Sequence, residues 1–358
     1  MKTLSIIISF YNSYPVTSGS SAVTTAFYKS WPSNKKLFMM NHEKKVSKKN
    51  IHNFKIKSNN SFVKLICLIP YLIFIYKEIK NSKIKYIIFE GASWTGFIYI
   101  SYVFFKIFRP NAKFIYHAHN VDFFFRQKNF FISKISFFFE KRILNKFDFS
   151  TAVSKNDLKK FKLYFKKKNI LLPNGIILKN NYKTDLKKQK YIIFSGSLEY
   201  EENRKIFKKL LKNEFQILKK LIPEIKIYLT GGGKFRLYDN NNDIIECGTP
   251  SFSKYLKILT NSLCVIVPGS NSTGTKIKII EPLCYNKVVF AHTKSLKGIK
   301  DNFNKYIEYN NLKEFEKKIK DFKKNNYNLK NIKVIGEYFR SNYNMKDIVR
   351  NFYVKNKL

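Results

Sequence analysis

The sequence is poor in acidic residues. Of its 358 residues only 24 are Asp or Glu, against 68 Lys and Arg, which gives a formal net charge of +44. A surface of this sign attracts anions of any kind, including nucleic acids, anionic lipid headgroups and phosphorylated small molecules. The chain is also rich in Asn, Ile, Phe and Tyr, the mixture that an AT-rich genome produces, and this bias explains the charge equally well.

Cysteine is scarce as well. The four cysteines lie far apart and form no Cys-x-x-Cys pair. A disulfide-rich secreted domain or a structural zinc site would need closer, paired cysteines. We therefore expect buried thiols, a reducing cytoplasm and no metal held by cysteine.

Long apolar runs are missing. The two longest, 65–76 and 91–108, are bounded or interrupted by lysine or proline, and neither supplies the ~18 residues of a spanning helix. Residues 4–10 are too short for a secretory signal and lack a cleavage site. We expect a cytoplasmic chain that is soluble or lies on a membrane surface.

Nucleic-acid-binding signatures are absent too. The sequence has no helix-turn-helix, zinc-finger, KH or RRM pattern, and its basic residues are spread over the whole chain instead of forming one stripe. Nucleic acid is therefore not an expected partner.

What is present is a regular alternation of short β-branched or aromatic runs with amphipathic segments. Hydrophobic residues make up 44% of the chain, enough for two cores, and the length favours two domains. Strands are expected at 4–10, 36–40, 85–89, 113–117, 149–153 and 170–172, then at 191–195, 225–230, 244–246, 264–267 and 288–291. Helices are expected at 20–30, 61–80, 94–107, 129–146, 154–166, 202–221, 252–260 and 275–285, with a helical tail over 311–356.

This alternation predicts an α/β fold of two doubly wound, Rossmann-like parallel-sheet domains facing a central cleft. The first domain is expected over 1–177 and the second over 191–340. Residues 178–190, polar and without period, suit a linker. Residues 341–358 are expected to form a helix that packs back on the first domain.

One helix start is suited to anion binding. Gly274 and Thr275 follow an apolar strand and a small polar loop, where free backbone N–H groups and the helix dipole attract phosphate. Lys276 or Lys278 would add a full charge, and Glu281 could accept hydrogen bonds from ribose hydroxyls. An ordinary capped helix with surface lysines explains this segment alone equally well.

Small-residue loops follow three other strands, at 9–28, 194–211 and 228–236. Each is a weak signal by itself. Together, at strand ends in both domains, they are typical of a site that holds phosphates.

Five segments, in order, carry a resemblance to one family. They are "YHAHNVDFFF" (116–125), "FSTAVSKNDLKKF" (149–161), "LLPNGI" (171–176), "FSGSLEYEENRKIFKKLL" (194–211) and "STGTKIKIIEPLCYNKVVFAHTKSLKGI" (272–299). They resemble the retaining glycosyltransferases of family 4, which have the GT-B fold. The resemblance implies transfer of a sugar from a nucleoside-diphosphate sugar to a glycan or lipid-linked acceptor in surface polysaccharide biosynthesis.

The resemblance also implies residue roles. Glu281 would bind the ribose and the residues around the helix start the diphosphate. The implied diphosphate contacts are Gly274, Thr275, Lys276 or Lys278, with Ser197 and Arg204 as weaker candidates. Gly19 would let the first loop close over the donor. His119 and Asn120 would face the transferring sugar or the acceptor.

Some positions depart from the family pattern. Thr273 stands where many members carry a first glutamate, and the first loop is reduced to Ser18–Gly19. Asp122 is a possible acceptor-side carboxylate, although a helix cap is the more ordinary role. We expect His117 to point to the other face of its strand and into the core. No Asp-x-Asp occurs, and the family is typically metal-independent, so lysines and the helix dipole are expected to replace a metal.

The alternatives to a transferase are a binding-only relative and a GT-B nucleotide-sugar epimerase. Two basic, aromatic segments, 123–142 and 158–168, have two interpretations of equal weight. Their aromatic residues are either core, or part of a surface that rests on an anionic inner leaflet.

Overall fold

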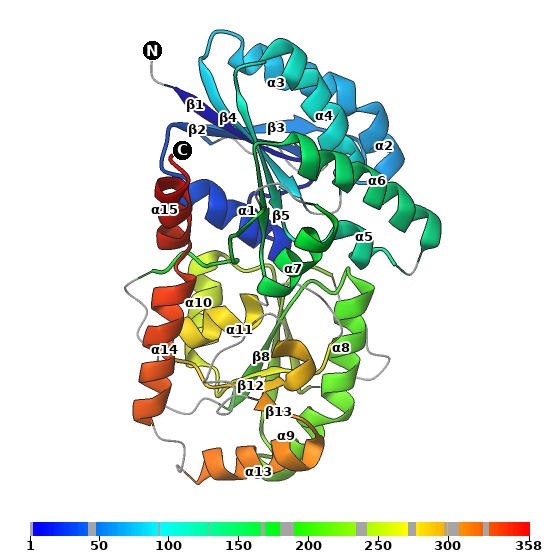
Figure 1. Ribbon diagram of the computed structural model, residues 1–358. Helices are drawn as coiled ribbons and strands as arrows, with labels where there is room; N and C mark the ends of the chain where they lie inside the picture. The colour runs from blue at the N-terminus through cyan, green and yellow to red at the C-terminus, as the bar shows by residue number, and fades with distance from the viewer. Residues whose placement is uncertain are drawn as a thin grey trace. The chain divides into compact units, whose positions relative to one another are not determined.

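The computed structural model describes residues 3–41, 48–91, 94–127, 129–165, 169–179, 190–233, 242–270, 277–296, 299, 308–324 and 329–358. The chain divides into two compact units (Figure 1). Unit 1 comprises Met1–Val16, Ser20–Asn174 and Met345–Leu358, and unit 2 comprises Thr17–Gly19 and Gly175–Asn344. Each contains one parallel sheet, so the predicted α/β class is confirmed. The expected linker lies almost wholly outside the described residues.

Unit 1 is built on seven strands in the order β3-β2-β1-β4-β5-β6-β7. They are β1 (Leu4–Ser9), β2 (Lys35–Asn41), β3 (Ile51–Lys55), β4 (Ile84–Gly91), β5 (Lys113–Ala118), β6 (Phe149–Ala152) and β7 (Asn169–Leu171). Every residue of β1 is buried. This is expected of a parallel strand that helices cover on both faces, and the sequence of such a strand is a nearly continuous apolar run.

Helices cover both faces of this sheet. They are α1 (Gly19–Ser30), α2 (Ser61–Ile66), α3 (Leu68–Ile79), α4 (Thr95–Phe108), α5 (Asp122–Phe125), α6 (Phe130–Lys146), α7 (Lys155–Tyr164) and α15 (Met345–Lys355). Ile6 and Ile8 share a core cluster with α3, α4 and α6. On the other face, Trp31 after α1 contacts Phe352 of α15, with ring centroids 6.4 Å apart. The last helix thus belongs to the first sheet (Figure 1).

Unit 2 has six parallel strands in the order β10-β9-β8-β11-β12-β13. They are β8 (Tyr191–Ser195), β9 (Lys226–Thr230), β10 (Ile244–Gly248), β11 (Val265–Val267), β12 (Val289–His292) and β13 (Glu308–Tyr309). One face packs against α8 (Glu201–Lys212), α9 (Glu214–Leu221) and α13 (Leu312–Lys323). The other packs against α10 (Phe252–Asn261), α11 (Ile277–Cys284) and α14 (Leu329–Tyr343). A short 3-10 helix, η1 (Thr293–Leu296), follows β12.

The differences from the sequence prediction are local. Strand β3 was not expected because "IHNFK" is an edge strand, in which only Ile51 is fully buried. The helices expected over 61–80 and 202–221 are each divided, at Cys67 and at Asn213. None of these changes alters the sheet order that positions the strand ends.

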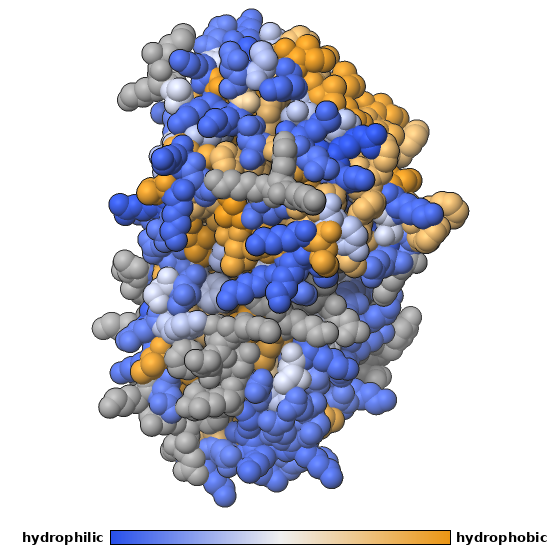
Figure 2. Space-filling model, in the orientation of Figure 1, coloured by the Kyte–Doolittle hydropathy of each residue, from blue (hydrophilic) through white to orange (hydrophobic). Residues whose placement is uncertain are grey.

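The surface of unit 1 is unevenly apolar. Figure 2 shows apolar residues gathered where Figure 1 places α2, α3 and α4. Among the described helices, none is long and apolar enough to cross a bilayer.

Candidate functional site

In unit 1, the carboxyl ends of β4 and β5 bring three titratable side chains together. Glu90 near the end of β4 lies beside His117 of β5, and His119 follows that strand directly. His119 Nε2 is 2.7 Å from Glu90 Oε2, and His117 Nδ1 is 3.1 Å from Glu90 Oε1. Thr24 of α1 donates a further hydrogen bond of 2.7 Å to Glu90 Oε2. The buried carboxylate therefore has three side-chain partners.

The charges in this cluster are set by burial and by those partners. Burial alone would raise the pKa of Glu90, but the positive character and hydrogen bonds of the two histidines outweigh it and hold the pKa below its usual range. Burial lowers the pKa of His119, against the opposing effect of Glu90. Glu90 is thus an anion that fixes the His119 ring with Nε2–H toward the carboxylate, which leaves Nδ1 as the remaining acceptor.

The expectation for His117 is half wrong. It is fully buried and stacks on Phe27 with ring centroids 4.3 Å apart, as a core residue would. It does not point to the opposite face from His119, however, because side chains two residues apart lie on the same side of a strand. Both rings reach Glu90. His117 Nε2 is buried without a hydrogen-bond partner among the described groups.

Asn120 and Asp122 follow this cluster. Asn120 Oδ1 is buried and has no partner within the described part of the chain. Asp122 is the first residue of α5, not its cap, and it is buried. It accepts hydrogen bonds from Thr95 and Arg126, both at 3.3 Å, so it fastens α4 to α5. Of the two, Asn120 is the side chain with unused hydrogen-bonding capacity.

The same cluster of side chains could also bind a metal ion. Glu90, His117 and His119 offer ligand atoms that all lie within 4.8 Å of one another. One carboxylate and two imidazoles match the ligand types of zinc and of other transition metals. In the structure Glu90 is joined by hydrogen bonds to His117 Nδ1 and His119 Nε2, while His117 Nε2 has no partner among the described groups.

In unit 2, α11 carries two of the predicted donor-binding residues on one face, because Lys278 and Glu281 are three positions apart. Tyr255 of α10 donates a 2.7 Å hydrogen bond to Glu281 Oε2. Burial raises the pKa of Glu281 to about 7, although this hydrogen bond opposes the shift. Tyr255 and Lys278, with Ser195 at the end of β8, line a small pocket beside β11.

Lys278 has no carboxylate within salt-bridge distance among the described residues. Its Nζ lies 6.0 Å from the centre of the Phe194 ring. Burial lowers its pKa to about 8, while the charge of Glu202 opposes the shift. A half-buried cation without a close anion would gain from binding one.

The loops after β8 and β9 lie against each other. Ser197 donates to the Gly232 carbonyl at 3.2 Å, and the Leu198 N–H donates to the same oxygen. Gly231 has φ +129°, and an added Cβ would lie 2.5 Å from the Gly196 carbonyl oxygen. Two backbones approach this closely only where one residue is glycine.

Arg204 supports the same loop. It donates to the carbonyls of Leu198 and Glu199, at 2.6 and 3.0 Å. The structure thus brings Ser197 and Arg204 together around one loop and gives both a structural partner.

Four positions before α11, and Gly19, complete the set of residues named from the sequence. Gly274, Thr275 and Lys276, together with Thr273, lie outside the described residues. Gly19 begins α1, and a Cβ added there would meet no atom within 4 Å. Its backbone conformation therefore does not by itself demand glycine.

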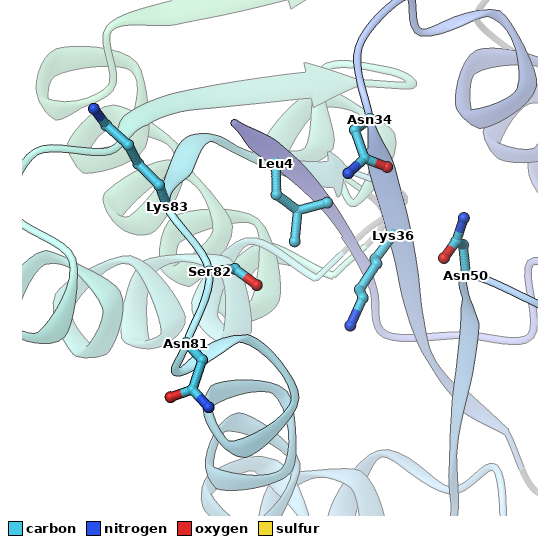
Figure 3. A pocket seen from close by; sticks show the side chains of 7 residues that line it. All are labelled: Leu4, Asn34, Lys36, Asn50, Asn81, Ser82 and Lys83. Carbon is cyan, nitrogen blue, oxygen red and sulfur yellow. The ribbon is translucent and has the colours of Figure 1, made fainter. Parts of the chain in front are cut away.

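A separate pocket of about 200 Å³ lies at the opposite edge of the unit 1 sheet, away from Glu90. Figure 3 shows its lining around the amino-terminal ends of β1, β2 and β4. Apart from Leu4 the lining is asparagine, serine and lysine. In doubly wound sheets ligands bind at the carboxyl ends of the strands, so this pocket is not the candidate site.

Sequence reasoning missed Glu90, Thr24 and Tyr255. The available signal for Glu90 was its place in "YIIFEG", a charge at the end of an apolar strand. Thr24 and Tyr255 gave no signal, because their importance depends on which helices pack beside which strand ends.

Comparison with known proteins identifies the class of fold. No protein-family model and no curated protein sequence matches the chain. Solved structures with two such sheets do match: the chain has the GT-B fold. A sucrose-phosphate synthase from Thermosynechococcus elongatus matches with a TM-score of 0.74 at 12% identity, over 99% of this chain and 98% of that one.

Two other matches are similarly complete. HepE from Anabaena, solved with UDP and glucose, has a TM-score of 0.70 at 12% identity over 99% of both chains. WaaG, a glycosyltransferase involved in lipopolysaccharide biosynthesis, has a TM-score of 0.65 at 9% identity, over 97% of this chain and 99% of that one. A putative UDP-N-acetylglucosamine 2-epimerase from Listeria monocytogenes matches less well, with a TM-score of 0.59 at 8% identity, over 98% of this chain and 95% of that one. At these identities the likeness shows the fold alone.

Proposed function

We propose that this protein is a retaining glycosyltransferase that moves a sugar from a nucleoside-diphosphate sugar to a glycan or lipid-linked acceptor. The observation that carries the proposal is Lys278, a half-buried cation without a close anion, one helical turn before Glu281. A diphosphate and a ribose are the ligands that this pair of side chains suits. The GT-B fold and neighbours solved with UDP and a sugar support this assignment.

The chemistry follows from the charge of the leaving group. When the bond between sugar and phosphate breaks, the nucleoside diphosphate gains negative charge, and a cation already in place stabilises that charge most in the transition state. Lys278 supplies this charge in the proposal, together with Gly274, Thr275 and Lys276, which precede α11 in the sequence. Glu281 holds the ribose. No metal is required by this scheme.

The unit 1 cluster is assigned to the sugar and acceptor side. Glu90 fixes the ring of His119, so that the imidazole presents a defined nitrogen to a hydroxyl group. Asn120 adds a free amide oxygen beside it. The family resemblance adds two points to the proposal. One is that the anomeric configuration is retained, and the other is that Gly19 lets the first loop close over the donor.

The acceptor is proposed to be a surface glycan or its lipid-linked precursor, reached at the inner leaflet of the membrane. Neighbours named for such pathways support this, among them WaaG. The excess of 68 basic over 24 acidic residues suits work at an anionic surface.

Thermal unfolding with a panel of UDP, GDP, ADP, CMP and their sugars, with and without EDTA, tests the donor site. A ligand that binds only the folded state raises the midpoint by mass action. We expect one diphosphate to do so in EDTA, and Glu281→Ala to abolish the shift. Glu337→Ala, an exposed carboxylate of α14, is the matched control and should keep it. If no nucleotide shifts the wild-type midpoint, the donor assignment is wrong.

Product analysis separates the alternatives. A binding-only relative would bind the nucleotide sugar without releasing the diphosphate, and an epimerase would change the sugar without any acceptor. NMR of the transferred sugar reports whether its anomeric configuration is retained.

A further inference from the structure

The outward side of four helices in unit 1 is apolar. Of the 23 large hydrophobic side chains exposed among the described residues, 14 lie on α2, α3, α4 and α6. We call these the apolar helix face: Phe62, Leu65, Ile66, Ile69, Ile73, Ile100, Val103, Ile107, Phe108, Phe130, Phe131, Ile132, Ile135 and Phe138. Helix α4 packs against both α3 and α6, so the residues form one continuous region, much of it visible in Figure 2.

The spacing of these residues is helical. Ile100, Val103 and Ile107 lie on one side of α4, while Ile98 and Phe105 on its other side are buried in the core. Helix α3 has the same arrangement, with Ile69 and Ile73 outward. A helix that is apolar all round normally has a second partner on its outer side, and within the described chain this face has none.

Base composition does not explain the face. An AT-rich genome would enrich isoleucine and phenylalanine in both units, yet the described residues of unit 2 include only four exposed large hydrophobic side chains, Tyr200, Phe252, Leu312 and Val334. The outward positions of α8 and α13 in unit 2 are largely lysine and glutamate. Among the described residues, most of the exposed apolar side chains therefore lie on these four helices of unit 1.

Basic side chains lie beside the face. Arg142 is stacked on Phe138, with the guanidinium 3.4 Å from the ring centre, and Lys134 Nζ is 4.2 Å from the centre of Phe130. Lys77, Lys106, Lys141 and Lys146 are exposed on the same helices. Their only exposed acid is Glu78, since Glu140 is buried. Apolar surface with cations at its edge matches the boundary between acyl chains and anionic headgroups.

We infer that the apolar helix face docks on an anionic phospholipid bilayer, with side chains of α2, α3, α4 and α6 entering the acyl region. The inference rests on the proposed function, because it places the acceptor side of the enzyme at the membrane. A second copy of the chain fits less well, since pairing two such faces would bring like charges together. In the basic segment around α7 the core interpretation is correct for Phe161 and Phe165, which are buried, whereas Leu163 and Tyr164 are exposed.

Flotation with vesicles tests the inference. The vesicles are phosphatidylcholine alone and phosphatidylcholine with about a third phosphatidylglycerol. The test variant is Ile73→Ser/Ile107→Ser/Ile135→Ser, at positions that are 43%, 69% and 57% exposed. The control is Leu312→Ser/Val334→Ser/Val354→Ser, outside the face and 38%, 48% and 66% exposed.

We expect the wild type and the control to float with the anionic vesicles, less so in high salt. The test variant should lose at least about tenfold in partitioning, because three apolar side chains no longer enter the acyl region. Its unfolding midpoint and its nucleotide-induced shift should stay those of the wild type, so that a failed donor site and a failed docking face give different results.

Two results would overturn the inference. One is equal flotation of test variant and control. The other is a wild type that ignores vesicles and forms a dimer in solution, which the test substitutions convert to a monomer.

Discussion

Removing one hydroxyl group, in Tyr255→Phe, tests the ionisation of Glu281. Tyr255 donates its 2.7 Å hydrogen bond to the Glu281 carboxylate, whose pKa burial raises to about 7. A hydrogen bond to a charged group is worth ~1.5–3 kcal/mol. Without it the anion is less stable, and the pKa should rise to ~8–9.

The effect on ligand binding follows from the ionised fraction. In the wild type about half of Glu281 is ionised at pH 7, and in Tyr255→Phe only ~1–10% would be. If the ribose binds the carboxylate form, diphosphate affinity at pH 7 should fall ~5- to 50-fold. Affinity in the wild type should rise with pH through about 7, as Glu281 ionises, and fall above about 8, as Lys278 loses its proton. In the variant, Glu281 ionises at about the pH at which Lys278 loses its proton, so the rise in affinity overlaps with the decline.

Calorimetric titration of the stabilising nucleotide from mildly acidic to mildly alkaline pH measures both limbs. Tyr353→Phe, in α15 of unit 1, removes a hydroxyl group far from α10 in the sequence and should behave as the wild type does. An unchanged rising limb in Tyr255→Phe, with unchanged affinity at neutral pH, would refute the reasoning.

Three further outcomes are expected. Lys278→Met should weaken diphosphate binding ~10- to 100-fold and abolish the decline above about pH 8, in the same titrations; a persistent decline would assign it to another group. Glu90→Gln should lower kcat about 100-fold through a misplaced His119, and leave nucleotide affinity unchanged, which steady-state kinetics and titration would separate. Gly231→Ala should lower the free energy of unfolding by ~1–3 kcal/mol in urea, because φ is +129° and the new Cβ would meet the Gly196 carbonyl. Gly19→Ala, where a Cβ meets nothing, should cost less than ~1 kcal/mol.

The fold was predictable because each strand buried on both faces leaves an apolar run in the sequence. Edge strands do not leave one: β3 pairs only with β2 and is mostly half-exposed. Its absence from the prediction reflects that physical difference. The divided helices were also out of reach, because the bends at Cys67 and Asn213 occur within continuous helical periodicity.

The site was predictable where it depends on local spacing. Lys278 and Glu281 share a helix face for that reason. Glu90 and His117 are 27 residues apart, and they meet only because β4 and β5 are neighbours whose register pairs those two residues. Tyr255 reaches Glu281 because α10 and α11 cover the same face of the unit 2 sheet. Contacts of this kind depend on how strands and helices pack in three dimensions, and the periodicity of the sequence carries no information about that packing.

The return of α15 to unit 1 has a consequence for synthesis. Between Asn174 and Met345 the ribosome makes 170 residues, all of them in unit 2. At ~5–20 residues per second this takes roughly 10–30 s. Throughout that time Trp31 and Tyr86 lack Tyr353, whose ring centroid lies 5.5 and 6.3 Å from theirs in the folded chain. Unit 1 is therefore completed only after unit 2 has been synthesised, and a nascent chain keeps an uncovered aromatic surface until α15 has emerged.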